Sequence, residues 1–291
     1  MIKLSNGHKF QFMVASGALG YDGLGWPWEW PLRWAGLLRP ELFTVVAKTL
    51  TLRPNPGDFS WRRPWNHVRL IPGGAVNKFG IANPGLDWWC KKIGPRVDAK
   101  KLPLIVSLYG NEDELWQMAQ ALEIFDLAGI EADVSCPNRK PISVETAVRN
   151  VKAIKSASRF PVIVKVSVAQ DYCGIAHKLR GIAEAVSLNS VPWEIAFPSE
   201  RSPLWRLQEK IGGGGGGVSG RPAQKFNWHA AERLAMLKAM PVIAPSIMEY
   251  GDLAKVDELR AAAYSFGAIH LRTPSKPTRI VLRWLAENQL Q

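Results

Sequence analysis

The chain has 291 residues, of which 47% are hydrophobic and 21% charged, so it can bury a large core and is not disordered in composition. It has no apolar run of the roughly 18–20 residues that a membrane span needs and no signal-peptide pattern. Its three cysteines are too few for a four-cysteine metal or iron–sulfur site. These features predict a cytoplasmic protein without a metal site. Its net charge of +12 indicates a solvated basic surface or a site for anions, but the basic residues are scattered and form no nucleic-acid-binding motif, so nucleic-acid binding is not expected.

Eight short apolar runs along the chain are predicted to be strands. Most are rich in Val and Ile and apolar on both faces, as parallel strands covered by helices must be. The runs are residues 10–16, 42–49, 102–110, 130–136, 161–167, 193–198, 241–246 and 268–273.

Amphipathic segments between several of these runs predict helices. Residues 111–129 carry apolar side chains on one stripe, at Leu115, Met118, Leu122 and Phe125. Residues 143–158 begin with Ser143, a helix-capping residue, and residues 276–290 close the chain.

Strands that alternate with helices in a chain of this length predict one (β/α)8 barrel domain over residues 1–291, with a doubly wound open sheet as the alternative. A barrel carries its chemistry at the carboxyl ends of its strands. Polar residues do follow the predicted strands, at Ser16, Gly17, Lys48, Thr49, Asp133 to Asn138, Lys165, Ser167, Ser246, Arg272 and Thr273.

Three segments interrupt the alternation. Residues 51–85 are loop-like and too long for an idle connection, which predicts a pocket-forming insertion or lid. Residues 199–223 contain six consecutive glycines, which indicate either a flexible linker or a mobile loop whose end exposes N–H groups to an anion. Residues 25–34 contain four tryptophans and are expected to pack locally, with a partner surface as the alternative.

Two lysines and one cysteine are candidates for chemistry. Lys48 and Lys165 each end a predicted strand, where an ammonium group is costly to desolvate unless it meets an anion. Either lysine alone is compatible with a surface position, but both together would aim positive charge at one ligand. Cys136 also ends a strand, and its thiol can serve as a nucleophile, as a general base or as a small buried hydrophobe.

The sequence resembles the dihydroorotate dehydrogenases in the order and spacing of six motifs. They are ASGALGYDG at 15–23, VVAKTLTLRPNPGD at 45–58, NKFGIANPG at 77–85, DVSCPN at 133–138, PVIVKVS at 161–167 and GGVSGRPA at 216–223. The resemblance runs from residue 12 to about residue 273. It is to the soluble class 1, because the membrane class has serine in place of this cysteine.

The resemblance implies a barrel that holds FMN at its carboxyl-terminal mouth and oxidises dihydroorotate to orotate in pyrimidine biosynthesis. Cys136 is implied as the general base that removes a proton from C5, while C6 delivers a hydride to the flavin. Lys48 is implied to lie beside substrate and flavin, as the second catalytic residue. The residues implied to contact FMN are Ala15, Ser16, Gly17, Lys48, Thr49, Asn77, Ser107, Asp133, Lys165, Gly217, Ser219, Gly220, Ser246, Arg272 and Thr273. The residues implied to contact the substrate are Asn77, Phe79, Gly80, Ile81, Asp133 and Asn138.

Three places depart from the family pattern. Asp133 stands where the family usually has asparagine, and an unpaired carboxylate there would repel an anionic substrate. The sixth predicted strand ends in Ala196 and Phe197 instead of asparagine followed by threonine or serine. At the phosphate site, Pro245–Ser246 replaces a glycine pair and Arg272–Thr273 replaces Gly-Thr; the proline removes one N–H donor, while the arginine offers a bidentate clamp.

These departures leave three functions open. The first is an FMN-dependent dihydroorotate dehydrogenase, the second an FMN oxidoreductase of the same fold that acts on another cyclic amide or unsaturated acid, and the third a flavin-free barrel with a binding or structural role. The sequence does not identify the electron acceptor. Use of NAD would need a second subunit, because this chain has no cluster cysteines, and the resemblance also implies a homodimer.

Overall fold

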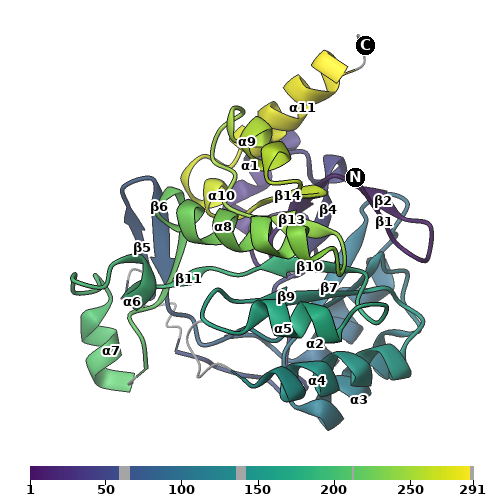
Figure 1. The fold of residues 1–291 in the computed structure, drawn as a ribbon. Coiled ribbons are helices and arrows are strands. Elements are labelled where there is room, and N and C mark those ends of the chain that lie inside the picture. Colours follow the sequence, from purple (N-terminus) through teal and green to yellow (C-terminus); the bar gives the residue numbers. More distant parts are fainter. Residues whose placement is uncertain (59–65, 136–141, 212, 289–291) are drawn as a thin grey trace.

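Eight parallel strands close into a barrel in the computed structural model, which describes residues 1–58, 66–135, 142–211 and 213–288 (Figure 1). The closed barrel confirms the (β/α)8 prediction over the open-sheet alternative. In chain order its strands are β3 (Phe12–Val14), β4 (Thr44–Val46), β7 (Leu104–Leu108), β8 (Gly129–Asp133), β9 (Val162–Val166), β10 (Ala185–Leu188), β13 (Val242–Ala244) and β14 (Ala263–Phe266).

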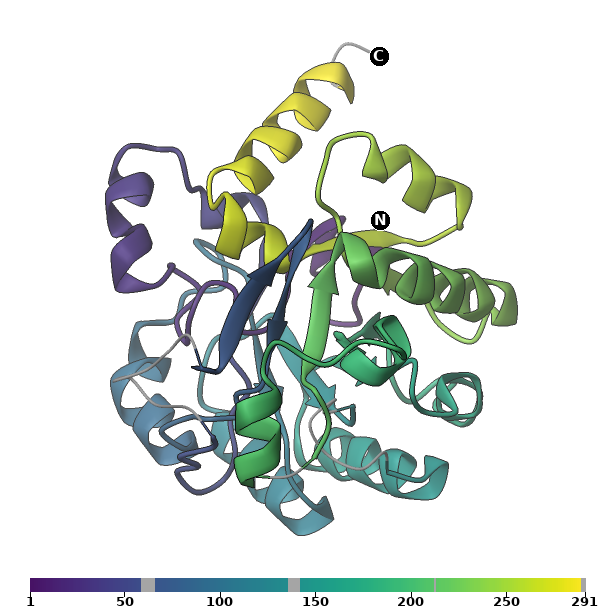
Figure 2. The ribbon, with the colours of Figure 1, turned by 90° about the vertical axis from the view of Figure 1, so that its left-hand side faces the viewer.

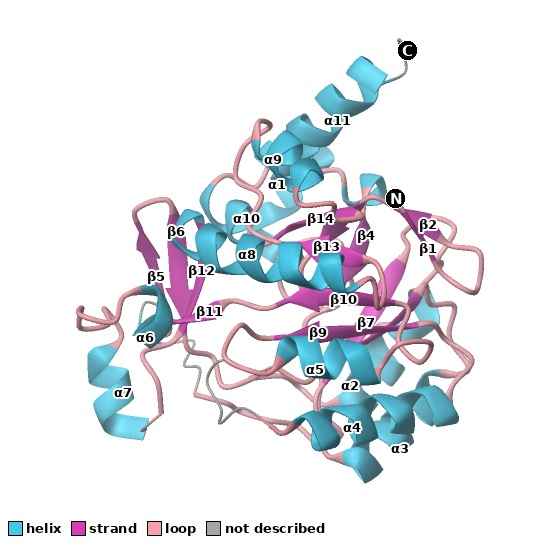
Figure 3. Ribbon diagram, viewed as in Figure 1, coloured by secondary structure: helices cyan, strands magenta, loops and turns pink. Residues whose placement is uncertain are grey.

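Helices surround the barrel on its outside (Figure 3). The main core lies between them and the outward side chains of the strands, such as Val45, Val106 and Val164. The larger helices are α2 (Leu86–Lys92), α3 (Glu112–Leu122), α4 (Val144–Ala157), α5 (Tyr172–Lys178), α8 (Arg221–Leu237), α9 (Asp252–Glu258) and α11 (Lys276–Asn288).

Capping residues set where two of the predicted helices begin. The Asn111 side chain accepts from the Glu114 N–H at the start of α3, and the Glu114 carboxylate accepts from the Asn111 N–H in return. Ser143 caps α4 as predicted, by accepting from the Thr146 N–H. Helix α3 ends at Leu122, which is earlier than predicted, although Phe125 beyond it is still buried.

A short hairpin closes one end of the barrel. Strands β1 (Ile2–Lys3) and β2 (Lys9–Phe10) pair antiparallel, and Figure 1 shows them at the end of the barrel opposite β5 and β6. Ile2, Leu4 and Phe10 pack on the first inward-facing residues of the barrel strands. Apolar side chains therefore fill this end of the barrel, and the polar residues at the carboxyl ends of the strands lie at the opposite mouth.

A four-stranded sheet stands in front of that opposite mouth, at the carboxyl ends of the barrel strands (Figure 2). Its strands run in the order β11 (Val191–Pro192), β12 (Gly217–Gly220), β6 (Gly74–Asn77) and β5 (Val68–Ile71), all antiparallel. The insertion predicted at 51–85 therefore contains the β5–β6 hairpin and is not loop throughout. The six-glycine run likewise ends inside strand β12, and helix α7 (Trp205–Ile211) precedes it.

Two of the eight predicted strands are helices. Residues 193–198 contain α6 (Trp193–Ala196), and residues 268–273 contain α10 (Ala268–Arg272). The sixth and eighth barrel strands are β10 and β14, which lie upstream of these helices. Both true strands carry an inward-facing serine that interrupts the apolar run, Ser187 in β10 and Ser265 in β14.

The tryptophan-rich segment 25–34 packs less than predicted. Its helix α1 (Trp30–Trp34) is short, and Trp28, Trp30 and Trp34 are exposed, with Trp34 77% accessible. Of its four tryptophans only Trp26 is partly buried, stacked on Trp28 at a ring-centroid distance of 5.3 Å.

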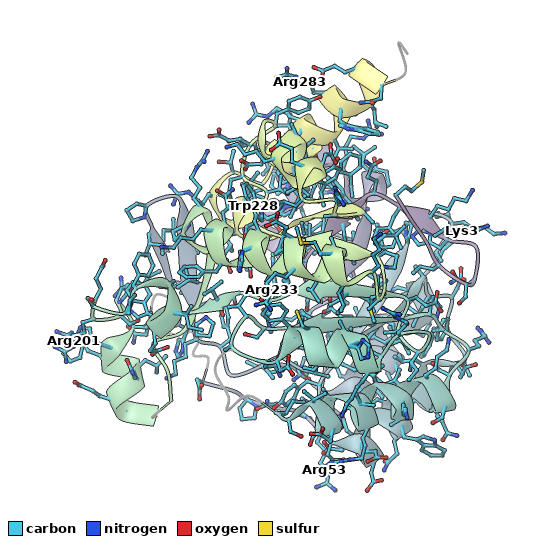
Figure 4. The ribbon with its side chains drawn as sticks, viewed as in Figure 1. Lys3, Arg53, Arg201, Trp228, Arg233 and Arg283 are labelled. Carbon is cyan, nitrogen blue, oxygen red and sulfur yellow. The ribbon has the colours of Figure 1, made fainter. Side chains whose placement is uncertain are left out.

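Basic side chains are spread around the molecule. Lys3, Arg53, Arg201 and Arg283 lie at widely separated points of its outline (Figure 4). Several are paired with acids, as Arg201 is with Glu209 and Arg283 with Glu287. These labelled side chains do not form one basic stripe. Within the described ranges no helix combines the length and the apolar character needed to cross a membrane.

Gly220→Ala is expected to destabilise the protein more than Gly7→Ala. Both glycines have a positive φ, +90° and +88°, so each substitution strains the backbone. A Cβ on Gly220 would lie 2.6 Å from the Gly73 carbonyl oxygen, whereas one on Gly7 would meet no described atom within 4 Å. We expect a loss of about 1 kcal/mol for Gly7→Ala and about 3 kcal/mol for Gly220→Ala in urea unfolding. Equal losses would contradict the close approach of β12 to the β5–β6 turn.

Candidate functional site

Three hydroxyl groups form a chain at the barrel mouth. The Ser16 hydroxyl donates to the Ala47 carbonyl oxygen at 2.9 Å and lies 3.0 Å from the Thr49 hydroxyl, which lies 3.0 Å from the Ser107 hydroxyl. They come from the ends of β3 and β4 and from β7. Ala15 beside them donates its N–H to the Phe266 carbonyl of β14. The structure thus brings four of the predicted FMN contacts together.

Lys165 lies between two carboxylates inside the barrel. Its Nζ is 2.8 Å from Glu131 Oε1 and 2.9 Å from Asp133 Oδ2, and all three side chains are buried. Burial alone would lower the pKa of Lys165, but the charges of Asp133 and Glu131 outweigh it and hold that pKa above its ordinary value. Lys165 is therefore a cation at neutral pH, and the Asp133 carboxylate is not unpaired.

Lys48 follows β4, which is three strands away from β9 around the barrel. Its Nζ is 5.7 Å from the centre of the Phe79 ring, which follows β6. A Cβ built on Gly17 would lie 3.6 Å from the Lys48 Cγ, so the chain after β3 also passes close to this lysine. Lys48, Gly17 and Phe79 are thus neighbours, as the resemblance implies.

The small sheet carries the next group of predicted residues. Asn77 pairs with Gly217 across β6 and β12, and its side-chain amide donates to the Gly217 carbonyl at 3.4 Å. Ser219 and Gly220 pair with Ala75 and Gly74 in the same ladder. The backbone after β6 then turns sharply, since Gly80 and the non-glycine Ile81 have positive φ values of 64° and 61°.

Of the residues predicted at the phosphate site, Arg272 and Thr273 are placed differently from the prediction. Ser246 follows β13 as expected and has a φ of 70°, a left-handed conformation suited to the glycine that the family has there. Arg272 and Thr273 are not at a strand end, because they lie in and after α10. The Arg272 guanidinium donates to the carbonyls of Ile71 and Gly74, which ties α10 to the β5–β6 hairpin. The residues that directly follow β14 are Gly267 and Ala268.

The amide thought to be missing at strand six is present. Ala196 and Phe197 belong to α6 and its end, whereas barrel strand β10 is followed by Asn189 and Ser190, an asparagine followed by serine. The Asn189 amide Nδ2 donates to the Ser135 carbonyl at 3.2 Å and lies 3.0 Å from the Ser135 hydroxyl. This departure from the family pattern is therefore withdrawn.

Sequence reasoning missed two groups at this site. Glu131 stands two residues before Asp133 on β8, and side chains two apart on a strand face the same side, so the alternation could have revealed it. Asn189 escaped notice because β10 was misplaced, and Ser135 was quoted in the polar stretch 133–138 but was given no role. Cys136 and Asn138 of the predicted site lie outside the described residues, in the segment directly after Ser135.

His270 on α10 is expected to make stability fall as the pH is lowered. It is fully buried, neither ring nitrogen has a hydrogen-bond partner among the described residues, and desolvation lowers its pKa from 6.5 to about 3. Between these values the unfolded state binds the extra proton, so its stabilising contribution is present above pH 6.5 and lost as the pH falls towards 3. We expect a slope on the order of 1 kcal/mol per pH unit in denaturant unfolding.

The control for this prediction is His177→Gln, at an exposed position on α5. His270→Gln should flatten the acid limb of the stability profile, whereas His177→Gln should leave it unchanged. An unaltered slope in His270→Gln would show that other groups cause the acid lability.

The sequence pattern of the family described as dihydroorotate dehydrogenase matches residues 35–246 of this chain. The chain is also similar to proteins named the catalytic subunit of dihydroorotate dehydrogenase B (NAD(+)). That of Desulforudis audaxviator is 29% identical over 274 residues, covering 90% of this chain and 83% of the relative. That of Geobacter metallireducens is 28% identical over 291 residues, covering 96% and 88%, and that of Geobacter sulfurreducens is 29% identical, covering 95% and 89%.

The family match spans most of the barrel, from before β4 to just beyond β13, and includes Thr49 after β4, Asp133 on β8 and Lys165 on β9. The relatives extend the similarity over nearly the whole chain. The closed barrel and the Asn189–Ser190 pair after β10 agree with the pattern of that family. The chain belongs to the dihydroorotate dehydrogenase family of flavin oxidoreductases, which act on a CH–CH donor.

Proposed function

We propose that this protein is an FMN-dependent dihydroorotate dehydrogenase, which oxidises dihydroorotate to orotate in pyrimidine biosynthesis and uses Cys136 as its general base. The observation that carries the proposal is the family match over residues 35–246. The arrangement at the mouth supports it, because Lys48 and Lys165 lie at the carboxyl-terminal ends of β4 and β9.

The residues at the mouth fit FMN at its ring end. The hydroxyls of Ser16, Thr49 and Ser107 supply hydrogen-bonding groups, and Lys165 supplies a buried cation. Towards the phosphate end, the left-handed Ser246 and the Gly267–Ala268 turn follow two neighbouring strands. The one poor feature is Pro245, which has no N–H to donate.

Bound FMN would accept a hydride, and the residues of this chain would handle the proton and the charge. We assign to the Cys136 thiolate the removal of the C5 proton, since a thiol of ordinary pKa about 8.5 is partly ionised near neutral pH. Lys165 would offset negative charge on the flavin side, and Lys48, with Phe79, Gly80 and Ile81 nearby, would hold the substrate side. The Asn77, Asn138 and Asn189 amides would bind polar edges of the substrate.

A different substrate for the same flavin is now less well supported. That alternative depended partly on the apparent lack of an amide side chain after the sixth strand, and Asn189 supplies this amide. The Asp133 objection is also weaker, because Lys165 pairs with its carboxylate at 2.9 Å.

We further propose that the protein acts as one domain over residues 1–291 in the cytoplasm, as a homodimer. Its relatives are named catalytic subunits of an NAD(+) enzyme, so we infer that a second subunit passes electrons to the acceptor. Copurification from the native host, followed by gel filtration, tests both assemblies.

Anaerobic titration of the purified protein with dihydroorotate tests the activity. We expect a yellow protein whose flavin absorbance bleaches on addition of about one equivalent of substrate per flavin. A colourless protein that takes up no FMN would favour a flavin-free barrel. A yellow protein that dihydroorotate does not bleach, but dithionite does, would favour another substrate.

A further inference from the structure

The cluster of Glu131, Lys165 and Asp133 has one more negative group than positive. Asp133 and Lys165 are register neighbours on β8 and β9, and Glu131 faces the same side of β8. With all three ionised, two carboxylates share one ammonium group, and the net charge is negative. Buried charges interact much more strongly than solvated ones, so the second carboxylate alters the field around Lys165 substantially.

Asp133 also makes contacts away from Lys165. Its Oδ1 accepts from the Ser135 N–H at 3.2 Å and from the Ser135 hydroxyl at 2.9 Å, while Oδ2 pairs with the lysine. The Ser135 hydroxyl and carbonyl oxygens accept from the Asn189 amide in turn. Asn189 Oδ1 then accepts from the Ser190 N–H at 2.7 Å, which fixes the orientation of the amide.

We propose that Asp133 is a positioning residue with two separable effects. Through Oδ2 it weakens the positive field of Lys165, so that negative charge created beside the lysine when a bound flavin is reduced is stabilised less than by a lysine with one carboxylate partner. Through Oδ1 and Ser135 it sets the amide of Asn189 for the substrate. This inference rests on the proposed function and adds a reason for an aspartate at a position where the family usually has asparagine.

Two substitutions separate the effects. Asp133→Asn removes one negative charge and keeps an oxygen that accepts from Ser135. Ser135→Ala keeps both carboxylates beside Lys165 and removes the hydroxyl that contacts Asn189. Glu145→Gln is the matched charge control, because Glu145 pairs with Lys178 on the exposed surface.

The first readout is the midpoint potential of the bound FMN, measured with a chemical reductant and no substrate. We expect Asp133→Asn to favour the reduced flavin about tenfold, which is about 30 mV for a two-electron couple. Ser135→Ala and Glu145→Gln should leave the potential unchanged. The second readout is steady-state kinetics, in which Ser135→Ala should raise the KM for dihydroorotate about tenfold with a much smaller change in kcat.

An unchanged or lowered potential in Asp133→Asn would overturn the charge effect, as would an equal shift in Ser135→Ala. An unchanged KM in Ser135→Ala would overturn the link to Asn189. If Asp133→Asn does not fold, Glu131→Gln likewise leaves Lys165 with one carboxylate partner and should raise the potential, and an unchanged potential there would overturn the charge effect. Failure of dihydroorotate to reduce the flavin, with the potential shift intact, would contradict only the proposed function, whereas a chain that binds no FMN would contradict both.

Discussion

Cys136→Ala is expected to slow the reduction of bound FMN by dihydroorotate by about 10²–10⁴-fold, the range that a positioned general base contributes. Alanine has no group that can take the C5 proton. The flavin should stay bound, because none of the residues assigned to hold it lies in the segment that directly follows Ser135 and contains Cys136. The measurement is anaerobic stopped-flow absorbance of the flavin after mixing with dihydroorotate.

The other two cysteines provide the controls. Cys90 lies on α2 and Cys173 on α5, both only partly buried, and burial raises the pKa of each thiol. Because both cysteines lie on helices and not at the ends of barrel strands, Cys90→Ala and Cys173→Ala should leave the reduction rate within a factor of about two. A Cys136→Ala rate equal to that of the unaltered protein would refute the base assignment, and a pH profile of the rate that shows no thiol titration would count against it as well.

The sequence predicted the barrel strands that Val and Ile dominate and missed β10 and β14, each of which carries an inward-facing serine. Strands β7 and β9 are recognisable because Val and Ile dominate them. Strand β10 contains Ser187, whose hydroxyl donates to Glu131 inside the barrel, and such inward polar groups break the apolar run. The inward-facing Ser187 thus made β10 harder to recognise as a strand from the sequence.

Helices α6 and α10 were predicted to be strands because each buries apolar side chains over a short length. Trp193 of α6 packs with Val76 and Val218 of the small sheet, and Ile269 of α10 enters the main core. A single sequence does not distinguish such a turn of helix from a strand of similar length. That ambiguity placed Ala196, Phe197, Arg272 and Thr273 at strand ends, so neither pair should have been compared with the strand-end residues of the family.

The motifs gave the members of the site more reliably than their partners. Lys165 and Asp133 were both predicted, but their ion pair depends on the register of β8 against β9, which only the folded sheet defines. The same holds for the contact of Ser135 with Asn189, which joins residues 54 positions apart. Local periodicity in the sequence does not predict long-range pairing of this kind.

Lys165→Met is expected to reduce the free energy of unfolding by about 3–5 kcal/mol at neutral pH, because it leaves Glu131 and Asp133 buried together without their cation. Methionine nearly preserves the volume of the side chain, so the loss reports charge and not packing. The matched control is Lys178→Met, whose ion pair with Glu145 is exposed, with side chains 52% and 62% accessible, and which should cost less than about 1 kcal/mol. Adding Asp133→Asn to Lys165→Met should recover part of the stability, since one unpaired carboxylate remains instead of two. The measurement is urea unfolding. Equal losses of stability in Lys165→Met and Lys178→Met, or a double variant less stable than Lys165→Met, would show that Lys165 does not stabilise these carboxylates in the core.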